Sequence, residues 1–234
     1  MNNVACVWIP PKYSISYVEI LYNSVKRHLS QPFNFYCLTT HPEEVNNPNI
    51  IPIALEKDTM FEAGNKAWWY KSNLFNKHVW EGQVLYLDLD TVIVNSLDKF
   101  FEWKADTFRI CQDFNRHAAP EYQVSNSSIM AFEANAHIDF YIDFQKEKVE
   151  NIRKHKGDQD WLTRILGANK NWWPKEWAMS YKWEVLKGGL KFMGTDQYNS
   201  NVTTLHYDTS VLVFHGKPNP EEVLDDTIIS ENWK

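Results

Sequence analysis

The first half of the chain alternates between short apolar runs and amphipathic segments, and this alternation limits the folds open to it. Residues 4–9 (VACVWI), 33–40 (FNFYCLTT) and 50–55 (IIPIAL) are short, mostly apolar and bounded by polar or proline residues, so we expect strands there. Between the first two, residues 16–29 carry apolar side chains at helical spacing. Strands alternating with helices predict an α/β fold with a mixed, mainly parallel sheet and helices on both faces.

The rest of the chain continues this pattern. Ser16 and Glu19 form a capping-box pattern, which predicts the start of the first helix. No repeat, low-complexity segment or long linker divides the chain, so we expect one domain, residues 1–234. Further strands are predicted at 84–94, 106–113, 126–132 and 210–218, and further helices at 66–78, 138–156 and 157–166.

Charge and cysteine usage narrow the class of protein. The formal net charge is -6, and Lys and Arg are scattered, which argues against a nucleic-acid partner. The apolar run at the N-terminus is too short for a membrane span or a signal sequence, so we expect a cytoplasmic protein. Cys6, Cys37 and Cys111 lie in separate strand-like segments without metal-ligand spacing, and we expect buried, reduced thiols.

Two carboxylates interrupt the most apolar run of the chain. Asp88 and Asp90 lie in LYLDLDTVIV, and on a strand both side chains would point to one face, where their repulsion makes burial costly. A divalent cation held by carboxylate oxygens would compensate them, and it could bridge the phosphates of a nucleoside diphosphate. The pair therefore predicts a metal site at the end of a central strand.

The same residues have two other interpretations. One Asp could cap a turn while the other pairs with a Lys. DLDTVI also fits the nucleophile motif of haloacid-dehalogenase-type phosphatases, with Asp225 and Asp226 as a later acidic pair. That motif normally ends the first strand of its domain, whereas here several elements precede it.

Several other polar residues follow predicted strands or begin helices. His215 ends an apolar strand and could be a third metal ligand, with Lys217 near a phosphate, although both could equally be solvated. Lys71 lies in an aromatic segment and faces either solvent, or the phosphates or Asp88 and Asp90. Asp158 or Asp160, together with Gln159, would hold a donor sugar, unless Asp158 only caps its helix. Asp113 would bind a sugar hydroxyl or start a turn, and Tyr13 would stack on a nucleotide base.

In this order the motifs resemble those of the GT-A glycosyltransferases, and within them the retaining, glycogenin-like group. The resemblance covers most of the chain, and it rests on Tyr13, on Lys71 in WWYKSNLF, on LYLDLDTVIV, on Asn126 and Ser127 in NSSIMAF, on GDQD at 157–160, and on FHGKP at 214–218. It differs from the family pattern in three places, one of which is Asp160, where the group often has Gly. Ile9, Pro10 and Pro11 stand where polar residues usually precede the Tyr, and the spacing from His215 to Lys217 is shorter than usual.

The resemblance implies a metal-dependent transferase. Asp88, Asp90 and His215 would bind Mn²⁺ or Mg²⁺, Lys217 would bind the diphosphate, and Asp158 and Gln159 would line the donor sugar, a UDP-sugar being favoured. We expect Lys71, Asp158 and Gln159 to act in catalysis, with Tyr13, Asp113 and Asn126 among the donor-binding residues. The acceptor would be a saccharide, lipid or protein, and retention of configuration is expected. A non-catalytic sugar-binding descendant of the fold is the other alternative.

Overall fold

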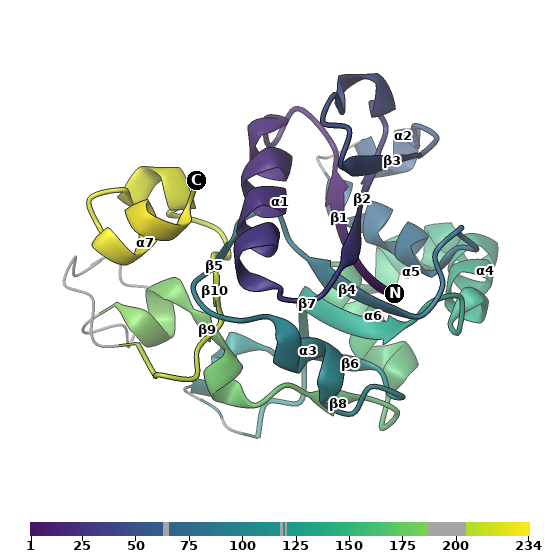
Figure 1. The fold of residues 1–234 in the computed structure, drawn as a ribbon. Helices are drawn as coiled ribbons and strands as arrows, with labels where there is room; N and C mark the ends of the chain where they lie inside the picture. Colours follow the sequence, from purple (N-terminus) through teal and green to yellow (C-terminus); the bar gives the residue numbers. More distant parts are fainter. Residues whose placement is uncertain (63–65, 118, 120, 187–204) are drawn as a thin grey trace.

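The computed structural model describes residues 1–62, 66–117, 119, 121–186 and 205–234, which form two sheets with helices around them (Figure 1). The strands of the larger sheet are β1 (Asn2–Trp8), β2 (Phe33–Thr39), β3 (Ile50–Ala54), β4 (Gln83–Leu87), β6 (Arg109–Gln112), β7 (Ser125–Glu133) and β8 (Asn171–Trp172). Their order is β3-β2-β1-β4-β7-β6-β8. Strands β3, β2, β1 and β4 are parallel, as are β6 and β8, while β7 runs antiparallel to both its neighbours. The predicted mixed, mainly parallel sheet is confirmed.

Side chains alternate between the two faces of this sheet and enter two apolar cores. On β1, Val4, Cys6 and Trp8 join the core under α1 (Ser16–His28), whereas Ala5 joins the core on the opposite face. Figure 1 shows α1 over one face and the helices α4 to α6 gathered beyond the other. Helices on both faces were predicted and are confirmed. The remaining α-helices are α2 (Thr59–Glu62), α3 (Asp98–Glu102), α4 (Ile138–Lys146), α5 (Lys148–Lys154), α6 (Asp158–Leu166) and α7 (Thr227–Asn232).

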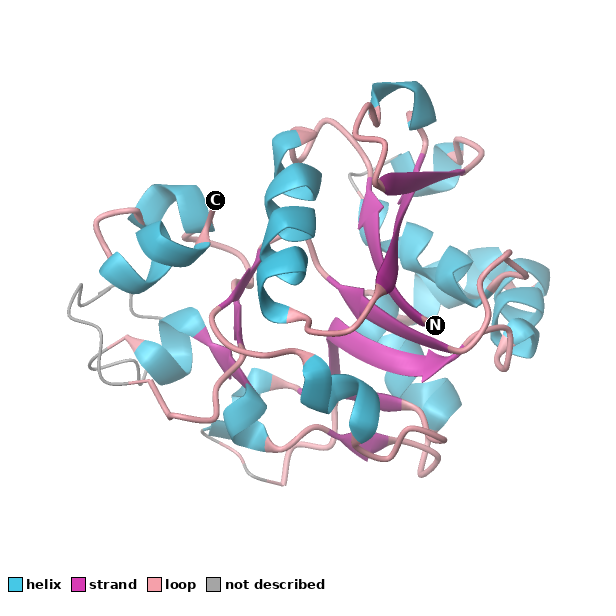
Figure 2. Cartoon of the chain, viewed as in Figure 1, coloured by secondary structure: helices cyan, strands magenta, loops and turns pink. Residues whose placement is uncertain are grey.

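A smaller sheet arises because the predicted strand 84–94 is broken after Leu87. The carbonyl of Asp88 accepts hydrogen bonds from the amide (3.3 Å) and the hydroxyl (2.8 Å) of Thr91, which closes a turn over Asp88–Thr91. The chain then enters β5 (Thr91–Ile93), which pairs antiparallel with β10 (Val211–Val213). In turn, β10 is parallel to β9 (Ala178–Ser180). Figure 2 shows this sheet between α1 and the C-terminal helices.

The predicted helix at 66–78 is a 3-10 helix, Ala67–Phe75, rather than an α-helix. Ser72 Oγ and Asn73 Nδ2 each donate to the carbonyl three residues earlier, which favours the tighter turn. The predicted helix at 138–156 is also interrupted, at Glu147, and Lys148 beyond the break pairs with Asp58 at 2.6 Å.

The capping box predicted at Ser16 is wrong. Ser16 lies inside the first turn of α1, and its hydroxyl lies 2.6 Å from that of Ser14. The carboxylate of Glu19 instead accepts a 2.8 Å hydrogen bond from Asn47, in the loop before β3. The helix therefore begins without a side-chain cap.

The C-terminal segment, which reads as a polar tail, is folded. The edge of Trp233 packs against Tyr17 of α1 with ring centroids 5.0 Å apart, and Arg27 donates to the carbonyls of Asn232 and Lys234 at 2.8 Å. None of the described helices combines the length and apolarity needed to span a membrane. The short helices are 3-10 helices at Pro42–Glu44, Phe114–His117, Lys175–Trp177 and Pro220–Val223, and a π-helix at Tyr181–Val185.

Candidate active site

The candidate site lies where the strand order of the larger sheet reverses. From β1 the chain moves outward through β2 and β3, and it then returns to place β4 on the other side of β1. Because β1 and β4 are parallel, the loops that follow them leave the same edge of the sheet, and open α/β sheets bind ligands at such a switch point. The two loops carry Tyr13, and Asp88 with Asp90.

A cavity of about 190 Å³ opens between these two loops. Four predicted site residues line it, Tyr13, Lys71, Asp88 and Asp90, and apolar side chains such as Val7, Ile9 and Leu89 form much of the remaining wall. A larger hollow of about 480 Å³, between α4 and α6, contains none of the predicted site residues. We therefore place the candidate site in the smaller cavity, because Lys71, Asp88 and Asp90, the charged residues among these four, line it.

Lys71 joins three elements at the floor of this cavity. Its ammonium lies 2.9 Å from Oδ1 of Asp88 and 3.4 Å from Oδ2 of Asp158, and it donates to the hydroxyl of Ser127 at 3.0 Å. Ser127 in turn donates to Asp158 at 2.5 Å. The 3-10 helix, β4, β7 and the start of α6 are thus held together through one buried cation.

The charges of this cluster reinforce one another. Burial lowers the pKa of Lys71, but Asp158 and Asp88 outweigh burial and raise that pKa above its usual value. Burial likewise raises the pKa of Asp88, but Lys71 and the hydroxyl of Tyr86, 2.5 Å from Oδ1, bring that pKa below its usual value. Both groups are therefore ionised at neutral pH.

Asp90 is in a different electrostatic position. No cation in the described part of the chain lies as close to it as Lys71 lies to Asp88, and burial together with the charge of Asp88 raises its pKa to about 6. Oδ2 accepts a 2.6 Å hydrogen bond from the hydroxyl of Tyr13, whose pKa is raised by burial and by the same carboxylate. Asp90 therefore has a hydrogen-bond donor but, among the described residues, no close cation, and it lies beside the ionised carboxylate of Asp88. Two such carboxylates provide the hard oxygen ligands that a divalent cation prefers.

The predicted sugar-binding residues form a second group beside the cavity. Nε2 of Gln159, one residue after Asp158 on α6, lies 3.5 Å from Oδ2 of Asp113 at the end of β6. The other oxygen of Asp113 accepts bonds from the amide (2.9 Å) and the side chain (2.7 Å) of Asn115. Asn126 is buried and accepts a 3.0 Å bond from the amide of Ser128. Asp158 is engaged with Lys71 and Ser127, and it makes no side-chain cap to its own helix.

His215 is placed by residues that the sequence did not single out. Its Nε2 lies 2.7 Å from the hydroxyl of Ser180, and its ring stacks on Phe114 with centroids 5.3 Å apart. Burial and the charge of Lys182 lower its pKa to about 3, so the imidazole is neutral. Neutral imidazole is the form that binds metal ions.

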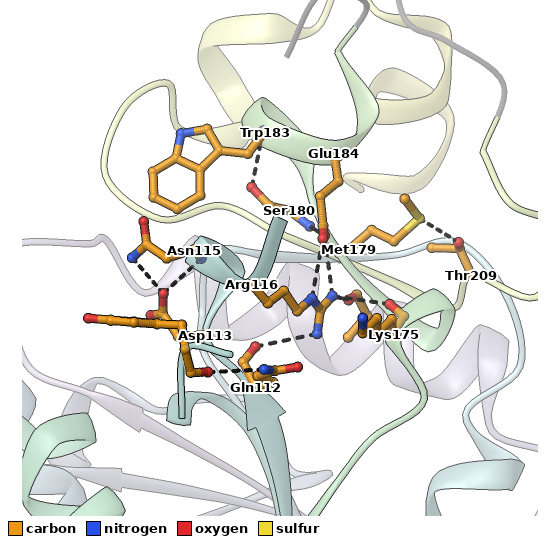
Figure 3. A network of polar contacts seen from close by, with 12 residues as sticks. Gln112, Asp113, Asn115, Arg116, Lys175, Met179, Ser180, Trp183, Glu184 and Thr209 are labelled. Carbon is orange, nitrogen blue, oxygen red and sulfur yellow. Dashed lines mark hydrogen bonds and ion pairs between the residues drawn. The ribbon is translucent and has the colours of Figure 1, made fainter. Parts of the chain in front are cut away.

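A buried ion pair fixes the segment that carries Ser180 (Figure 3). Arg116 lies 3.2 Å from Glu184 on the π-helix, and it also donates to the carbonyl of Ala178 at 2.8 Å. Glu184 accepts a 2.8 Å bond from the amide of Ser180. The sequence carries no spacing signal for this pair, because its members are separated by 68 positions.

The structure does not bring every predicted ligand together. Among the described residues, no three His, Cys, Asp or Glu side chains are grouped closely enough to hold a metal ion, so His215 does not complete a ready-made site with Asp88 and Asp90. The ammonium of Lys217 pairs with Glu222 at 2.6 Å. The metal role of His215 and the phosphate role of Lys217 stay predictions.

The acidic pair required by the phosphatase alternative lies elsewhere. Asp226 caps α7 by accepting a 2.9 Å bond from the amide of Ile228, and it accepts another, of 2.8 Å, from the hydroxyl of Tyr181. In addition, β4 is the fourth strand along the chain rather than the first. The phosphatase alternative therefore has no support from the geometry.

Solved structures that resemble the chain are glycosyltransferases. The galactosyltransferase LgtC, solved with donor and acceptor sugar analogues, matches with a TM-score of 0.68 and 13% identity over 99% of this chain and 96% of its own. GlyE of Streptococcus pneumoniae TIGR4 matches with a TM-score of 0.66 and 16% identity over 99% of this chain. The bifunctional glycosyltransferase WbbM matches with a TM-score of 0.61 and 14% identity over 98% of this chain.

These likenesses establish the fold. The chain spans 63% of the length of GlyE and 50% of that of WbbM. No protein-family model matches the sequence, and no curated protein matches it in sequence. The chain has the GT-A fold of these glycosyltransferases, as its motifs predicted.

Proposed function

We propose that the protein is a glycosyltransferase that takes its sugar from a nucleoside diphosphate sugar with the help of a divalent cation. The observation that carries this proposal is the placement of Asp88, Asp90 and Lys71 in one cavity at the switch point of a GT-A fold, with Asp158 3.4 Å from Lys71. Sugar transfer from such a donor leaves a diphosphate, and its negative charge must be stabilised as the bond breaks.

The donor atoms in the cavity suit Mn²⁺ or Mg²⁺. Asp88 and Asp90 supply carboxylate oxygens, and the neutral imidazole of His215 is our candidate for a nitrogen ligand, which Mn²⁺ tolerates better than Mg²⁺. When bound, the cation would neutralise charge on the diphosphate leaving group.

The protein's own residues have separate roles in this proposal. Lys71 keeps its proton because its pKa is raised, so it presents a permanent positive charge at the floor of the cavity. At the N-terminus of α6, Asp158 lies 3.4 Å from Lys71 and Gln159 lies 3.5 Å from Asp113, and both would hold donor sugar hydroxyls. Lys217 is the candidate for a phosphate contact.

Finer features of the activity belong to the same proposal. We propose a hexosyl donor, retention of anomeric configuration, and a saccharide, lipid or protein as the acceptor, in agreement with the motif resemblance. A cytoplasmic location is supported by three buried cysteines that form no disulfide. We also propose that residues 1–234 function as one domain.

A turnover assay tests the proposal. Release of nucleoside diphosphate from a panel of UDP- and GDP-sugars should require Mn²⁺ or Mg²⁺, and Asp90→Ala should abolish it. Asp225→Asn is a matched acidic control that should retain activity. Hydrolysis of p-nitrophenyl phosphate, lost in Asp225→Asn, would instead support a phosphatase, and saccharide binding without turnover would identify a binding module.

A further inference from the structure

The loop after β1 offers few hydrogen-bond donors to a nucleotide. Ile9 has an apolar side chain, and neither Pro10 nor Pro11 has a backbone N–H. This loop nevertheless forms part of the wall of the candidate cavity. A base that lies against Ile9, Pro10 and Pro11 can be held by apolar contact, and these three residues offer its polar edge little to bind.

Tyr13 does not supply that recognition in this structure. Its ring stacks on Tyr17 with centroids 4.5 Å apart, and the ammonium of Lys12 lies 4.5 Å from the ring centre. Its hydroxyl is bonded to Asp90. The predicted stacking of a base on Tyr13 would therefore require this residue to leave three partners.

A second hollow adjoins the candidate cavity, and neither Asp88 nor Asp90 lines it. It has a volume of about 300 Å³, and it shares Ile9 and Ala67 with the cavity that holds Asp88 and Asp90. Pro10 and Pro11 form one wall. This volume is at the lower end of the range for small-ligand sites, about 300–1,000 Å³. The two hollows are therefore neighbours, one lined by Asp88 and Asp90 and the other by a partly apolar set of residues.

Polar groups line the second hollow together with the two prolines. Tyr70 donates to Oε1 of Glu62 at 3.5 Å, and no bond to the other carboxylate oxygen comes from the part of the chain that the structure describes. Lys57 has no ion-pair partner within the part of the chain that the structure describes. His41 contacts Thr40 Oγ1 through Nδ1 at 3.0 Å, and its Nε2 is left for a further contact. The lining of the hollow thus includes both a carboxylate acceptor and an ammonium donor.

We propose that this second hollow binds the base of the donor nucleotide, and that Glu62 and Lys57 select guanine. The inference rests on the proposed function, since it assumes that the diphosphate lies at Asp88 and Asp90. Guanine presents two neighbouring N–H donors and an adjacent carbonyl acceptor on one edge, which complements a carboxylate and an ammonium. Uracil presents a single N–H between two carbonyls, so it would leave the carboxylate less well satisfied. This proposal favours a GDP-sugar, whereas the motif resemblance favours a UDP-sugar.

Equilibrium binding of fluorescent GDP and UDP in the presence of Mn²⁺ tests this assignment. The wild-type protein should bind GDP at least about tenfold more tightly than UDP, as expected for one matched set of base-edge hydrogen bonds. Glu62→Gln and Lys57→Met should weaken GDP binding by about the same factor and leave UDP binding unchanged. Glu56→Gln, a neighbouring exposed carboxylate outside the hollow, is the matched control and should preserve the preference.

The possible failures are distinguishable. Equal binding of both nucleotides, or a GDP preference that survives both substitutions, overturns the guanine assignment. If in that case Asp90→Asn still abolishes binding, the proposed function stands. If neither nucleotide binds with Mn²⁺ or Mg²⁺, the proposed function and the inference both fail. Glu62 and Lys57 are exposed, so both variants should fold, and thermal unfolding checks this.

Discussion

The hydroxyl of Tyr13 donates a 2.6 Å hydrogen bond to Oδ2 of Asp90 and so links the loop after β1 to the turn after β4. The carbonyl of Tyr13 is itself fixed by a 2.9 Å bond from the indole of Trp8, whose side chain is buried. The two loops that flank the switch point therefore hold each other before any ligand arrives.

Tyr13→Phe removes only the hydroxyl from this link. A hydrogen bond to a charged group contributes about 1.5–3 kcal/mol, so we expect the free energy of unfolding of the metal-free protein to fall by about that amount at pH 7.5. Urea unfolding measures it. Tyr207→Phe, which changes a highly exposed tyrosine, is the control and should unfold like the wild type. Equal stability of the two variants would show that the bond to Asp90 contributes nothing.

The buried ammonium of Lys71 should be required for stability as well as for activity. Lys71→Met leaves Asp88 and Asp158 without their cation, and breaking a buried pair in this way costs about 3–5 kcal/mol. Lys146→Met, which removes an exposed pair with Asp143, should be much less destabilising and should retain turnover. Chemical denaturation and the nucleoside diphosphate release assay measure the two effects. A Lys71→Met variant that is active and as stable as the wild type would contradict the role given to Lys71.

The raised pKa of Asp90 should make the free energy of unfolding depend on pH when EDTA has removed metal ions from the protein. Its pKa in the folded state is about 6, whereas a carboxyl in the unfolded chain has a pKa of about 3.9. Between these values the folded protein binds more protons than the unfolded chain, so the free energy of unfolding should fall as the pH rises from about 4 to about 6. Asp90→Asn should lack this fall. Urea unfolding at several pH values measures the difference in free energy of unfolding between the wild type and Asp90→Asn. A difference that stays constant from about pH 4 to about pH 6 would contradict the raised pKa of Asp90.

The ion pair between Arg116 and Glu184 should hold the π-helix in place. Arg116→Met leaves the carboxylate of Glu184 largely buried without a partner, at a cost of about 3–5 kcal/mol. Arg153→Met, which removes an exposed pair with Glu150, should have a much smaller effect. Thermal unfolding compares the two variants. Equal effects would mean that the buried pair does not stabilise the segment bearing Ser180.

Much of the fold was predictable because it depends on local patterns. Short apolar runs in the sequence predicted β1, β2 and β4. The position of Asp88 and Asp90 in the last of these runs predicted that they lie at the carboxyl end of β4. The break after Leu87 was not predictable from hydrophobicity, since Val92 and Ile93 continue the apolar run. It depends on the bonds from Thr91 to the carbonyl of Asp88.

The site was less predictable than the fold, because its contacts join distant parts of the chain. Lys71 was a candidate only because a charge stood in an aromatic segment, yet it contacts residues 17 and 56 positions away. Tyr86 lies two residues before Asp88 and faces the same side of the strand, a signal that could have been used. Nothing local indicated that His215 would contact Ser180, 35 positions away.

The central claim is that Asp88 and Asp90 hold a divalent cation that binds a nucleoside diphosphate. The most direct test is thermal unfolding of the wild type and Asp90→Asn with GDP or UDP, in Mn²⁺ and in EDTA. At a ligand concentration 100 times the dissociation constant, binding adds about 2.7 kcal/mol, which corresponds to a rise of several degrees in the melting temperature. The account predicts this rise only for the wild type with Mn²⁺ present. An equal rise in EDTA, or an equal rise in Asp90→Asn, would contradict it.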